Sequence, residues 1–281
     1  MWECPDFFQL PGTNAWVFKA SAQTEAGDHD YWTVGSFEEV SGLTKADRFK
    51  LASGNDILDG NQRLDHGTFY ASKSFYDTPN KRTVLFGWVR YNCTGSNWAG
   101  IQSFPRVVKL DPVNTRKIIT FPIPEISRLY SSSPVREKIA IPPGNSVILG
   151  NGAQLDVTLK MGLTPSTAVG GAINISVRAL GSPDGMTGLD VSLKSNSTAG
   201  ELDGNAFSIQ VDEPFVSLRV LVDRSVVETF AQGGRAVVTH PYCRPSEKDT
   251  LFVVTNLGVT TLQLDTSFAH VSTANALPGQ A

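Results

Sequence analysis

Short runs of alternating apolar and polar residues recur along almost the whole chain. A period of two is typical of β-strands, and these runs are rich in β-branched and aromatic residues. Turn sequences such as "TPNKR", "GSPDG" and "NLG" separate the runs, and the sequence holds no long amphipathic helical pattern. The pattern therefore predicts an all-β chain. Its strands are expected at residues 30–37, 83–89, 107–111, 154–161, 172–180, 216–223, 225–231, 236–242, 251–256 and 261–265.

A proline-rich segment interrupts this pattern. Residues 121–145 hold five of the sixteen prolines and a serine triplet. Because proline cannot donate a hydrogen bond to a sheet ladder, the segment predicts a linker, with one helical turn at 125–130. All five tryptophans precede it, whereas the later part is aliphatic. We expect an N-terminal, site-bearing β domain over 1–120, a linker over 121–133 and a C-terminal β-sandwich over 134–275.

Composition and charge exclude several classes of function. The chain has 281 residues, of which 41% are hydrophobic, so it is long enough for one large or two medium domains with real cores. A net charge of −3 argues against a protein that binds nucleic acid or a membrane surface, which would need basic clusters. The longest apolar runs are strand-sized, so no membrane span is expected.

The three cysteines, Cys4, Cys93 and Cys243, carry little information about function. They fit neither a zinc spacing nor a dense disulfide framework, so neither a metal nor another cofactor is expected. Residues 1–20 lack a basic start followed by an apolar stretch, so they do not predict a signal peptide.

The chain opens with "MWECPDFF", which places a glutamate, Glu3, among Trp2, Cys4 and Phe7. Removing a carboxyl group from water favours its protonated form, which is the form that a general acid needs. Asp6 would act in the same direction while it is ionised. The alternative is a surface acid at a frayed chain end, and this stretch alone favours that alternative slightly.

Two further segments combine aromatic and polar residues. In "LDHGTFYASKSFYD", over 64–77, Asp65, Tyr70 and Lys73 fall within nine residues, and a turn at "DHG" would bring Asp65 beside the strand. In "NWAGIQSFPR", over 97–106, Trp98 is either a platform for a sugar ring or a core residue. Taken alone, the first segment favours an ordinary hairpin with a solvated lysine, and the second a core tryptophan.

The segment "VDRSVVETFAQGGRAVVTHPY", over 222–242, contains Asp223, Arg224 and Glu228. These charged residues are expected on strands of the second domain. The pattern there favours a structural interpretation, with a salt-bridged sandwich edge and a hairpin at "GG".

Four of these segments resemble sequence blocks of glycoside hydrolase family 32, which comprises plant-type invertases, fructan exohydrolases and fructosyltransferases. They are "MWECPDFF", "FYASKSFYD", "WAGIQSFPR" and "VDRSVVETFAQGGR". The blocks occur in the family's order and extend over nearly the whole chain. The resemblance implies part of a five-bladed β-propeller, its later blades, followed by a C-terminal β-sandwich.

The resemblance also implies a set of site residues. The glutamate of the first block is the family's general acid/base, which corresponds to Glu3. Cys4 would tune this glutamate, and aromatic rings would stack on a sugar. The residues expected to line the substrate pocket are Cys4, Asp6, Asp65, Tyr70, Lys73, Trp88 and Trp98.

Two other carboxylates of the family are not found in the sequence. The nucleophile lies in an N-D-P-N-G block and the transition-state stabiliser in an R-D-P block; the only Asp-Pro here begins at Asp111, after Leu110. A retaining glycosidase needs an acid and a nucleophile about 5–5.5 Å apart. We therefore expect a later portion of a β-fructosidase that is inactive alone and needs an N-terminal propeller half, in cis or in trans. The alternative is a non-catalytic carbohydrate-binding or regulatory relative.

Substrate and location follow from the same resemblance. Plant sucrose-cleaving relatives often carry an Asp-x-x-Lys pair before the "DYYT"-like strand, whereas "EAGDHDYWT" has Ala26 and Gly27 and no lysine. Sucrose preference is thus in doubt, which leaves fructan hydrolysis or transfer open. The family implies a secreted, cell-wall or vacuolar protein, with its signal upstream. N-glycosylation is expected at Asn92, Asn174 and Asn196, on turns or strand ends.

Overall fold

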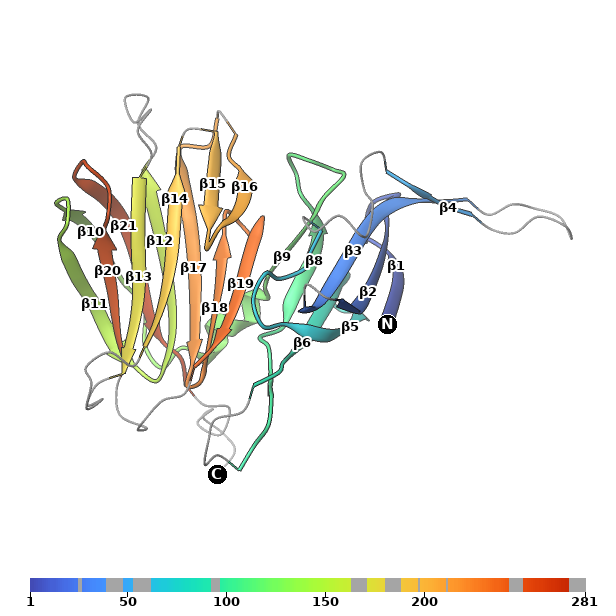
Figure 1. The fold of residues 1–281 in the computed structure, drawn as a ribbon, viewed down its shortest axis with the longest axis horizontal. Helices are drawn as coiled ribbons and strands as arrows, with labels where there is room; N and C mark the ends of the chain where they lie inside the picture. The colour runs from blue at the N-terminus through green and yellow to red at the C-terminus, as the bar shows by residue number, and fades with distance from the viewer. Residues whose placement is uncertain are drawn as a thin grey trace, which may run out of the picture. The chain divides into compact units, whose positions relative to one another are not determined.

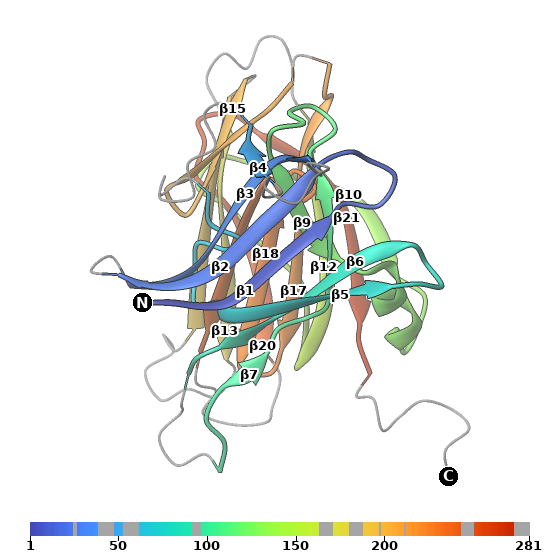
Figure 2. The ribbon, with the colours of Figure 1, turned by 90° about the vertical axis from the view of Figure 1, so that its right-hand side faces the viewer.

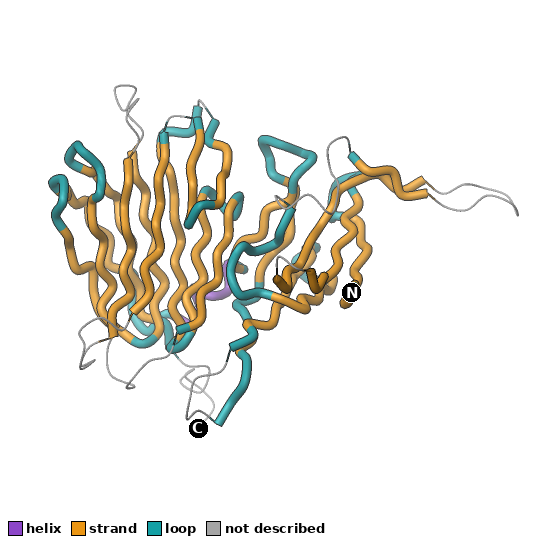
Figure 3. The backbone as a smooth tube through the Cα atoms, viewed as in Figure 1, coloured by secondary structure: helices purple, strands orange, loops and turns teal. Residues whose placement is uncertain are grey.

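The fold consists almost entirely of β-strands (Figure 3). The computed structural model describes residues 1–24, 27–38, 48–52, 62–91, 97–162, 171–179, 188–196, 198–210, 212–242 and 250–272. The all-β prediction is confirmed, and each of the predicted strands overlaps an observed one. The described residues include one short 3-10 helix, Pro124–Leu129, where a helical turn was predicted. Within these residues no helix has the length and apolar character needed to cross a membrane.

The chain divides into two compact units, Met1–Ile123 and Pro124–Ala281. The division falls inside the predicted linker, where Pro122 and Pro124 flank the boundary. Proline cannot extend a sheet ladder, which explains why strand pairing stops here. The assignment of the first unit to propeller blades and of the second to a sandwich stays a prediction.

The first unit contains two antiparallel sheets (Figure 1). One has the order β1 (Trp2–Gln9), β2 (Trp16–Thr24), β3 (Gly27–Glu38) and β4 (Arg48–Leu51). The other has the order β5 (Tyr70–Asp77), β6 (Arg82–Val89), β8 (Arg106–Leu110) and β9 (Ile118–Pro122), with β7 (Ile101–Gln102) also paired to β6. Strands β1 and β5, each at an edge of its sheet, lie side by side (Figure 2).

Both sheets of the first unit contribute to a single cluster of buried apolar side chains. Val17 and Trp32 come from the first sheet, whereas Leu85 and Val108 come from the second. Phe69, just before β5, packs so closely on β6 that a Cβ at Gly87 would lie 2.1 Å from its ring. This core packs the two sheets of the unit against each other.

The second unit consists of two six-stranded antiparallel sheets. The first has the order β10 (Val135–Ile141), β21 (Leu262–His270), β12 (Gln154–Gly162), β17 (Phe215–Asp223), β18 (Val226–Ala231) and β19 (Ala236–Pro241). The second has the order β11 (Ser146–Gly152), β20 (Thr250–Asn256), β13 (Gly171–Ala179), β14 (Gly188–Ser195), β15 (Ala199–Leu202) and β16 (Asn205–Ser208). One cluster of buried apolar side chains draws on both sheets, for example Val157 and Val220 from the first and Phe252 from the second.

The structure partly corrects the interpretation of residues 222–242. The predicted "GG" hairpin is confirmed, since Gly233 and Gly234 join β18 to β19 with φ of 67° and 98°. The predicted charged edge does not include Asp223 or Glu228, which lie on the interior strands β17 and β18. Glu228 is fully buried on β18, which pairs on both sides, and Asp223 accepts a hydrogen bond of 2.9 Å from the neutral amide of Gln154.

Candidate active site

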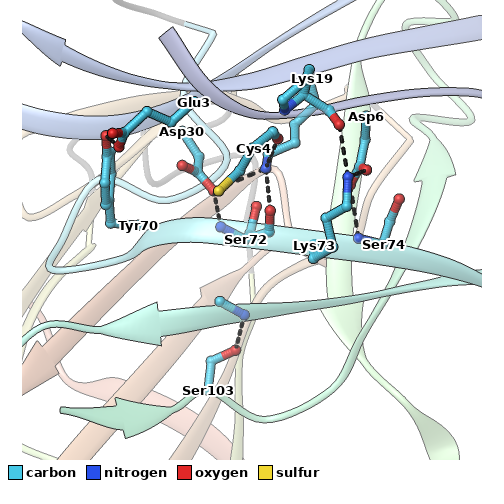
Figure 4. Close-up of polar contacts among 12 residues, drawn as sticks. Glu3, Cys4, Asp6, Lys19, Asp30, Tyr70, Ser72, Lys73, Ser74 and Ser103 are labelled. Carbon is cyan, nitrogen blue, oxygen red and sulfur yellow. Dashed lines mark hydrogen bonds and ion pairs between the residues drawn. The ribbon is translucent and has the colours of Figure 1, made fainter. Parts of the chain in front are cut away.

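Glu3 and Tyr70 form a hydrogen-bonded pair between the two sheets of the first unit. The Tyr70 hydroxyl donates to Glu3 Oε2 over 2.7 Å, from β5 to β1 (Figure 4). Tyr70 is buried, and Glu3 is partly exposed. Burial, followed by the hydrogen bond to Glu3, raises the pKa of Tyr70 well above its usual value. The phenol therefore remains a donor throughout the neutral range.

A β-bulge follows each member of this pair. On β1, residues 4 and 5 oppose the single residue Ala20 of β2, and on β5, residues 71 and 72 oppose Gly87 of β6. The first bulge residue is left-handed in both cases, with φ of 43° at Cys4 and 47° at Ala71. For a non-glycine residue this conformation costs about 1–2 kcal/mol. A β-bulge re-aims the side chains beside it, here those of Glu3 and Tyr70.

A buried lysine, Lys19 on β2, contacts both bulges. Its ammonium donates to the carbonyl oxygen of Cys4 over 3.0 Å and to the carbonyl oxygen of Ser72. The Asp30 carboxylate lies 3.6 Å away and also accepts from the Ser72 amide over 2.8 Å. Burial lowers the pKa of Lys19, and the charge of Asp30 opposes that shift. Figure 4 shows this group beside the Glu3–Tyr70 pair.

Asp6 and Lys73 form a second connection between β1 and β5. Their side chains form an ion pair, and the Lys73 ammonium also donates to the carbonyl oxygen of Pro5 over 2.7 Å. The other oxygen of Asp6 accepts from the Ser74 amide over 2.8 Å. The structure thus brings these two predicted site residues together, with Asp6 buried and Lys73 largely exposed. Their predicted role in substrate binding stays a prediction.

Asp65 lies in the turn before β5, where its side chain has two buried partners. It is fully buried, and its two oxygens accept from the Gly67 amide and from the Arg106 guanidinium, each over 2.8 Å. The Arg106 guanidinium also lies 4.4 Å from the centre of the Phe69 ring. Asp65 therefore contributes to a buried ion pair of the unit, and its predicted substrate contact is untested.

Two hollows flank the start of β5. One, of about 380 Å³, is lined by Ala71, Lys73, Trp88 and Gln102 among others. Trp88 is 42% exposed and packs on Gly100, where a Cβ would lie 2.1 Å from the indole nitrogen. The predicted sugar platform Trp98 is 38% exposed, so the expectation of a core residue there is not met.

The second hollow, of about 410 Å³, lies on the side of Tyr70. Its lining includes His29 and the ion pair between Asp28 and Arg90. Tyr70 lines the second hollow, and the next residue, Ala71, lines the first. In the part of the chain that the structure describes, no group of three or more His, Cys, Asp or Glu side chains is placed to hold a metal ion.

The glycosylation sites differ in their structural setting. Asn196 lies in the turn between β14 and β15, is exposed, and accepts hydrogen bonds from the backbone of Thr198 and Ala199. Asn174 lies in the middle of β13, which pairs with strands on both sides, so its expected position on a turn or strand end is wrong. Asn92 lies outside the described residues.

The sequence also carries signals for Lys19 and Asp30, which were not among the predicted site residues. Lys19 is a charged residue within the apolar run "WVFKASA", and Asp30 begins the apolar run "DYWTV". A charge inside a buried strand requires a partner, so the two together indicate an internal ion pair.

Comparison with known proteins identifies the family. The model of the glycosyl hydrolases family 32 N-terminal domain matches residues 1–122, and that of the family 32 C-terminal domain matches residues 145–270. The chain therefore belongs to glycoside hydrolase family 32.

Relatives and solved structures agree with this assignment. An acid beta-fructofuranosidase of Phaseolus vulgaris is 30% identical over 85% of the chain, and a vacuolar acid beta-fructofuranosidase 2 of a Rosa hybrid cultivar is also 30% identical over 85%. The chain spans 45% and 46% of their lengths, which is about half. A fructan 1-exohydrolase IIa variant of Cichorium intybus, solved with 1-kestose, has the same fold over 97% of the chain and 62% of its own, with 23% identity and a TM-score of 0.73.

Proposed function

We propose that the chain is the acid/base-bearing portion of a glycosidase that acts on β-fructofuranosides, either sucrose or fructans. The observation that carries the proposal is the hydrogen bond from Tyr70 to Glu3, in the block that resembles the family's acid/base motif. The named activities of the relatives and the bound 1-kestose of the chicory enzyme support this substrate class. Glu3 is the general acid/base of the proposed reaction.

The proposed reaction is a retaining double displacement at the anomeric carbon of the fructosyl unit. A nucleophilic carboxylate forms a bond to this carbon while Glu3 gives its proton to the departing glycosidic oxygen. Glu3, now a carboxylate, then takes a proton from an incoming water or sugar hydroxyl, whose oxygen displaces the nucleophile. The nucleophile comes from an N-D-P-N-G block outside these 281 residues, so the chain is inactive alone.

Tyr70 suits this alternation of Glu3 between acid and base. Because its pKa is raised, it stays protonated and can donate to the carboxylate form of Glu3. Tyr70 thus donates to the Glu3 carboxylate and keeps it oriented after the leaving group has taken its proton.

The two hollows beside β5 are the proposed places for sugar units. The exposed indole of Trp88 provides an apolar face for a sugar ring, with Lys73 and Gln102 as polar neighbours. The hollow beside Tyr70 offers the charged groups of Asp28 and Arg90 as hydrogen-bonding partners for hydroxyls. Sucrose, fructan and an acceptor sugar are all compatible with these groups.

The remaining proposals concern architecture and location. We assign the two sheets of the first unit to later blades of a five-bladed β-propeller. The two sheets of the second unit share one core, which supports its assignment as a β-sandwich. The relative from the Rosa hybrid cultivar is described as vacuolar, which supports a secreted, cell-wall or vacuolar location for this chain.

The role of Glu3 is tested in an assembled enzyme, in which this chain is joined to, or mixed with, the N-terminal half of a family 32 relative. Glu3→Gln should lower kcat on sucrose and inulin by about 10²–10⁴-fold, because the amide cannot supply a proton. On an aryl β-fructofuranoside with an acidic phenol leaving group, formation of the fructosyl-enzyme should be largely preserved, since that group departs without protonation.

The matched control is Asp77→Asn, at the far end of β5, where Asp77 pairs with Arg82. That variant should retain activity on both kinds of substrate. Equal loss by Glu3→Gln on the natural and the activated substrate would contradict a role in proton transfer.

A further inference from the structure

We propose that Lys19 is a positioning residue, whose buried ammonium clamps the two β-bulges that aim Glu3 and Tyr70 at each other. This inference rests on the proposed acid/base role of Glu3 for its catalytic consequence. The clamp itself is a structural claim about Lys19, Cys4 and Ser72 that is independent of that role.

The position of Lys19 makes it the link between two sheets. It lies on β2, is 1% exposed, and donates to carbonyl oxygens of β1 and of β5. Strands β1 and β5 are edges of different sheets, and they are not paired by a backbone ladder. Side-chain bonds therefore fix their relative position, and Lys19 supplies two of them from a single atom.

Each bond ends at a bulge rather than at a regular strand position. Cys4 follows Glu3 and is itself left-handed, and Ser72 follows the left-handed Ala71, which follows Tyr70. Neither left-handed residue is glycine, so each bulge requires surrounding contacts to persist. Lys19 supplies a contact to both bulges from the interior.

The charge of Lys19 is accommodated in a way that strengthens the clamp. Asp30 lies 3.6 Å from the ammonium and accepts from the Ser72 amide, so the peptide groups on both sides of Ser72 are held by one buried ion pair. On the opposite strand, β6, Gly87 is held in turn by Ser103, which exchanges two hydrogen bonds of 2.9 Å with it. The second bulge is therefore braced from both sides.

A small displacement of either bulge would separate Glu3 from Tyr70. Misplacement of a catalytic group by about 1 Å can cost about 10²-fold in rate. Loss of the clamp should thus lower kcat, whereas KM should change less, because most residues that line the hollows lie outside the two bulges. A residue that only stabilised the unit would change the amount of folded protein instead.

The first test measures the bulges in the 281-residue chain alone. Lys19→Met/Asp30→Asn removes both charges, so no uncompensated charge stays buried. NMR couplings and chemical shifts that report φ should show loss of the left-handed conformation at Cys4 and Ala71. Adding Ala71→Gly should restore it at position 71, because glycine adopts positive φ without cost. Val17→Ala, a buried apolar truncation on the same strand, is the control and should leave both bulges unchanged.

The second test uses the assembled enzyme. Lys19→Met/Asp30→Asn should lower kcat by about 10–100-fold with KM nearly unchanged, and Ala71→Gly in that background should recover part of the loss. Val17→Ala should keep kcat per folded molecule. If the double variant does not fold, Asp30→Asn alone keeps the Lys19 ammonium beside both carbonyl oxygens and should leave both bulges left-handed. Loss of the left-handed φ at Cys4 or Ala71 in that variant would overturn the clamp.

The possible outcomes separate the clamp from the function. Unchanged φ at Cys4 and Ala71 in the folded double variant would overturn the clamp, whatever the role of Glu3. Altered bulges with unchanged kcat would overturn the positioning role. Full turnover by Glu3→Gln would instead refute the proposed function and leave the NMR result on Lys19 standing.

Discussion

The Tyr70 hydroxyl lies 2.7 Å from Glu3 Oε2, although the two residues are 67 positions apart in the sequence. They meet because each lies next to a bulge on an edge strand, β1 or β5. The pair joins a carboxylate to a phenol whose pKa is raised, first by burial and then by this hydrogen bond. The hydrogen bond holds the Glu3 carboxyl group in one orientation.

Replacing Tyr70 by phenylalanine should therefore lower the kcat of the assembled enzyme, because Glu3 loses the hydrogen-bond donor that orients it. Loss of a hydrogen bond to a charged group, worth about 1.5–3 kcal/mol, predicts a fall in kcat of roughly 10–100-fold. A kcat on sucrose and inulin equal to that of the unmodified enzyme would contradict this account of Tyr70.

A second tyrosine gives a stability prediction for the other unit. The Tyr130 hydroxyl donates to Asp156 over 2.7 Å, and burial, together with this bond, raises the pKa of Tyr130 to about 12. Below about pH 10, Tyr130→Phe should lower the free energy of unfolding by about 1–2 kcal/mol.

The sign of the pH dependence follows from the direction of this shift. As the pH rises from about 10, the usual pKa of tyrosine, the unfolded chain ionises Tyr130 while the folded chain does not. The contribution of Tyr130 is therefore lost between pH 10 and about 12, its folded pKa. Urea unfolding followed across this range should show that the free energies of unfolding of the unmodified protein and of Tyr130→Phe converge. A constant difference between them would contradict this role of Tyr130.

The fold was predictable where side-chain alternation is strong. β17 and β20 alternate regularly and were predicted within a residue or two of their ends. Strands such as β10 (Val135–Ile141), which carries mostly exposed side chains, gave little signal. Its pairing with β21 supplies the order that its own residues do not indicate.

The candidate site was predictable in its residues but not in its geometry. The block around Glu3 and the strand carrying Tyr70 were recognised, yet their contact depends on left-handed residues at Cys4 and Ala71. Neither alanine nor cysteine signals such a conformation, because glycine is the residue that usually adopts it. The bulges arise from tertiary contacts with Lys19, and the side-chain pattern within a single strand does not indicate such contacts.

Close packing of a glycine against an aromatic ring gives a prediction that is independent of catalysis. A Cβ at Gly200 on β15 would lie 2.1 Å from the ring of Phe207, its partner on β16. Gly200→Ala should destabilise the second unit by about 1–3 kcal/mol, since the ring must move. Gly162→Ala, where a Cβ meets nothing within 4 Å, is the control in the same unit. Equal unfolding midpoints for the two variants would show that the ring relocates freely.

The setting of the glycosylation sites predicts which of them is modified. Asn196 is exposed in a turn, and its side-chain oxygen is within 3.2 Å of the Thr198 hydroxyl, as in an Asx turn. In protein from a secretory host we expect a glycan at Asn196, absent in Thr198→Ala. Ser176→Ala, which removes the sequon of Asn174 in the middle of β13, should change the glycan mass little. Mass spectrometry that finds Asn196 unmodified and Asn174 occupied would reverse this assignment.

The central claim is that this chain supplies the acid/base, Glu3, and that another segment supplies the nucleophile. The most direct measurement is fructose release from sucrose and from inulin by the 281-residue chain alone and by the assembled enzyme. We predict no measurable release by the chain alone, and release by the assembled enzyme that Glu3→Gln sharply lowers. Robust release by the chain alone, abolished by Glu3→Gln, would contradict the account, because a carboxylate within the chain would then be the nucleophile.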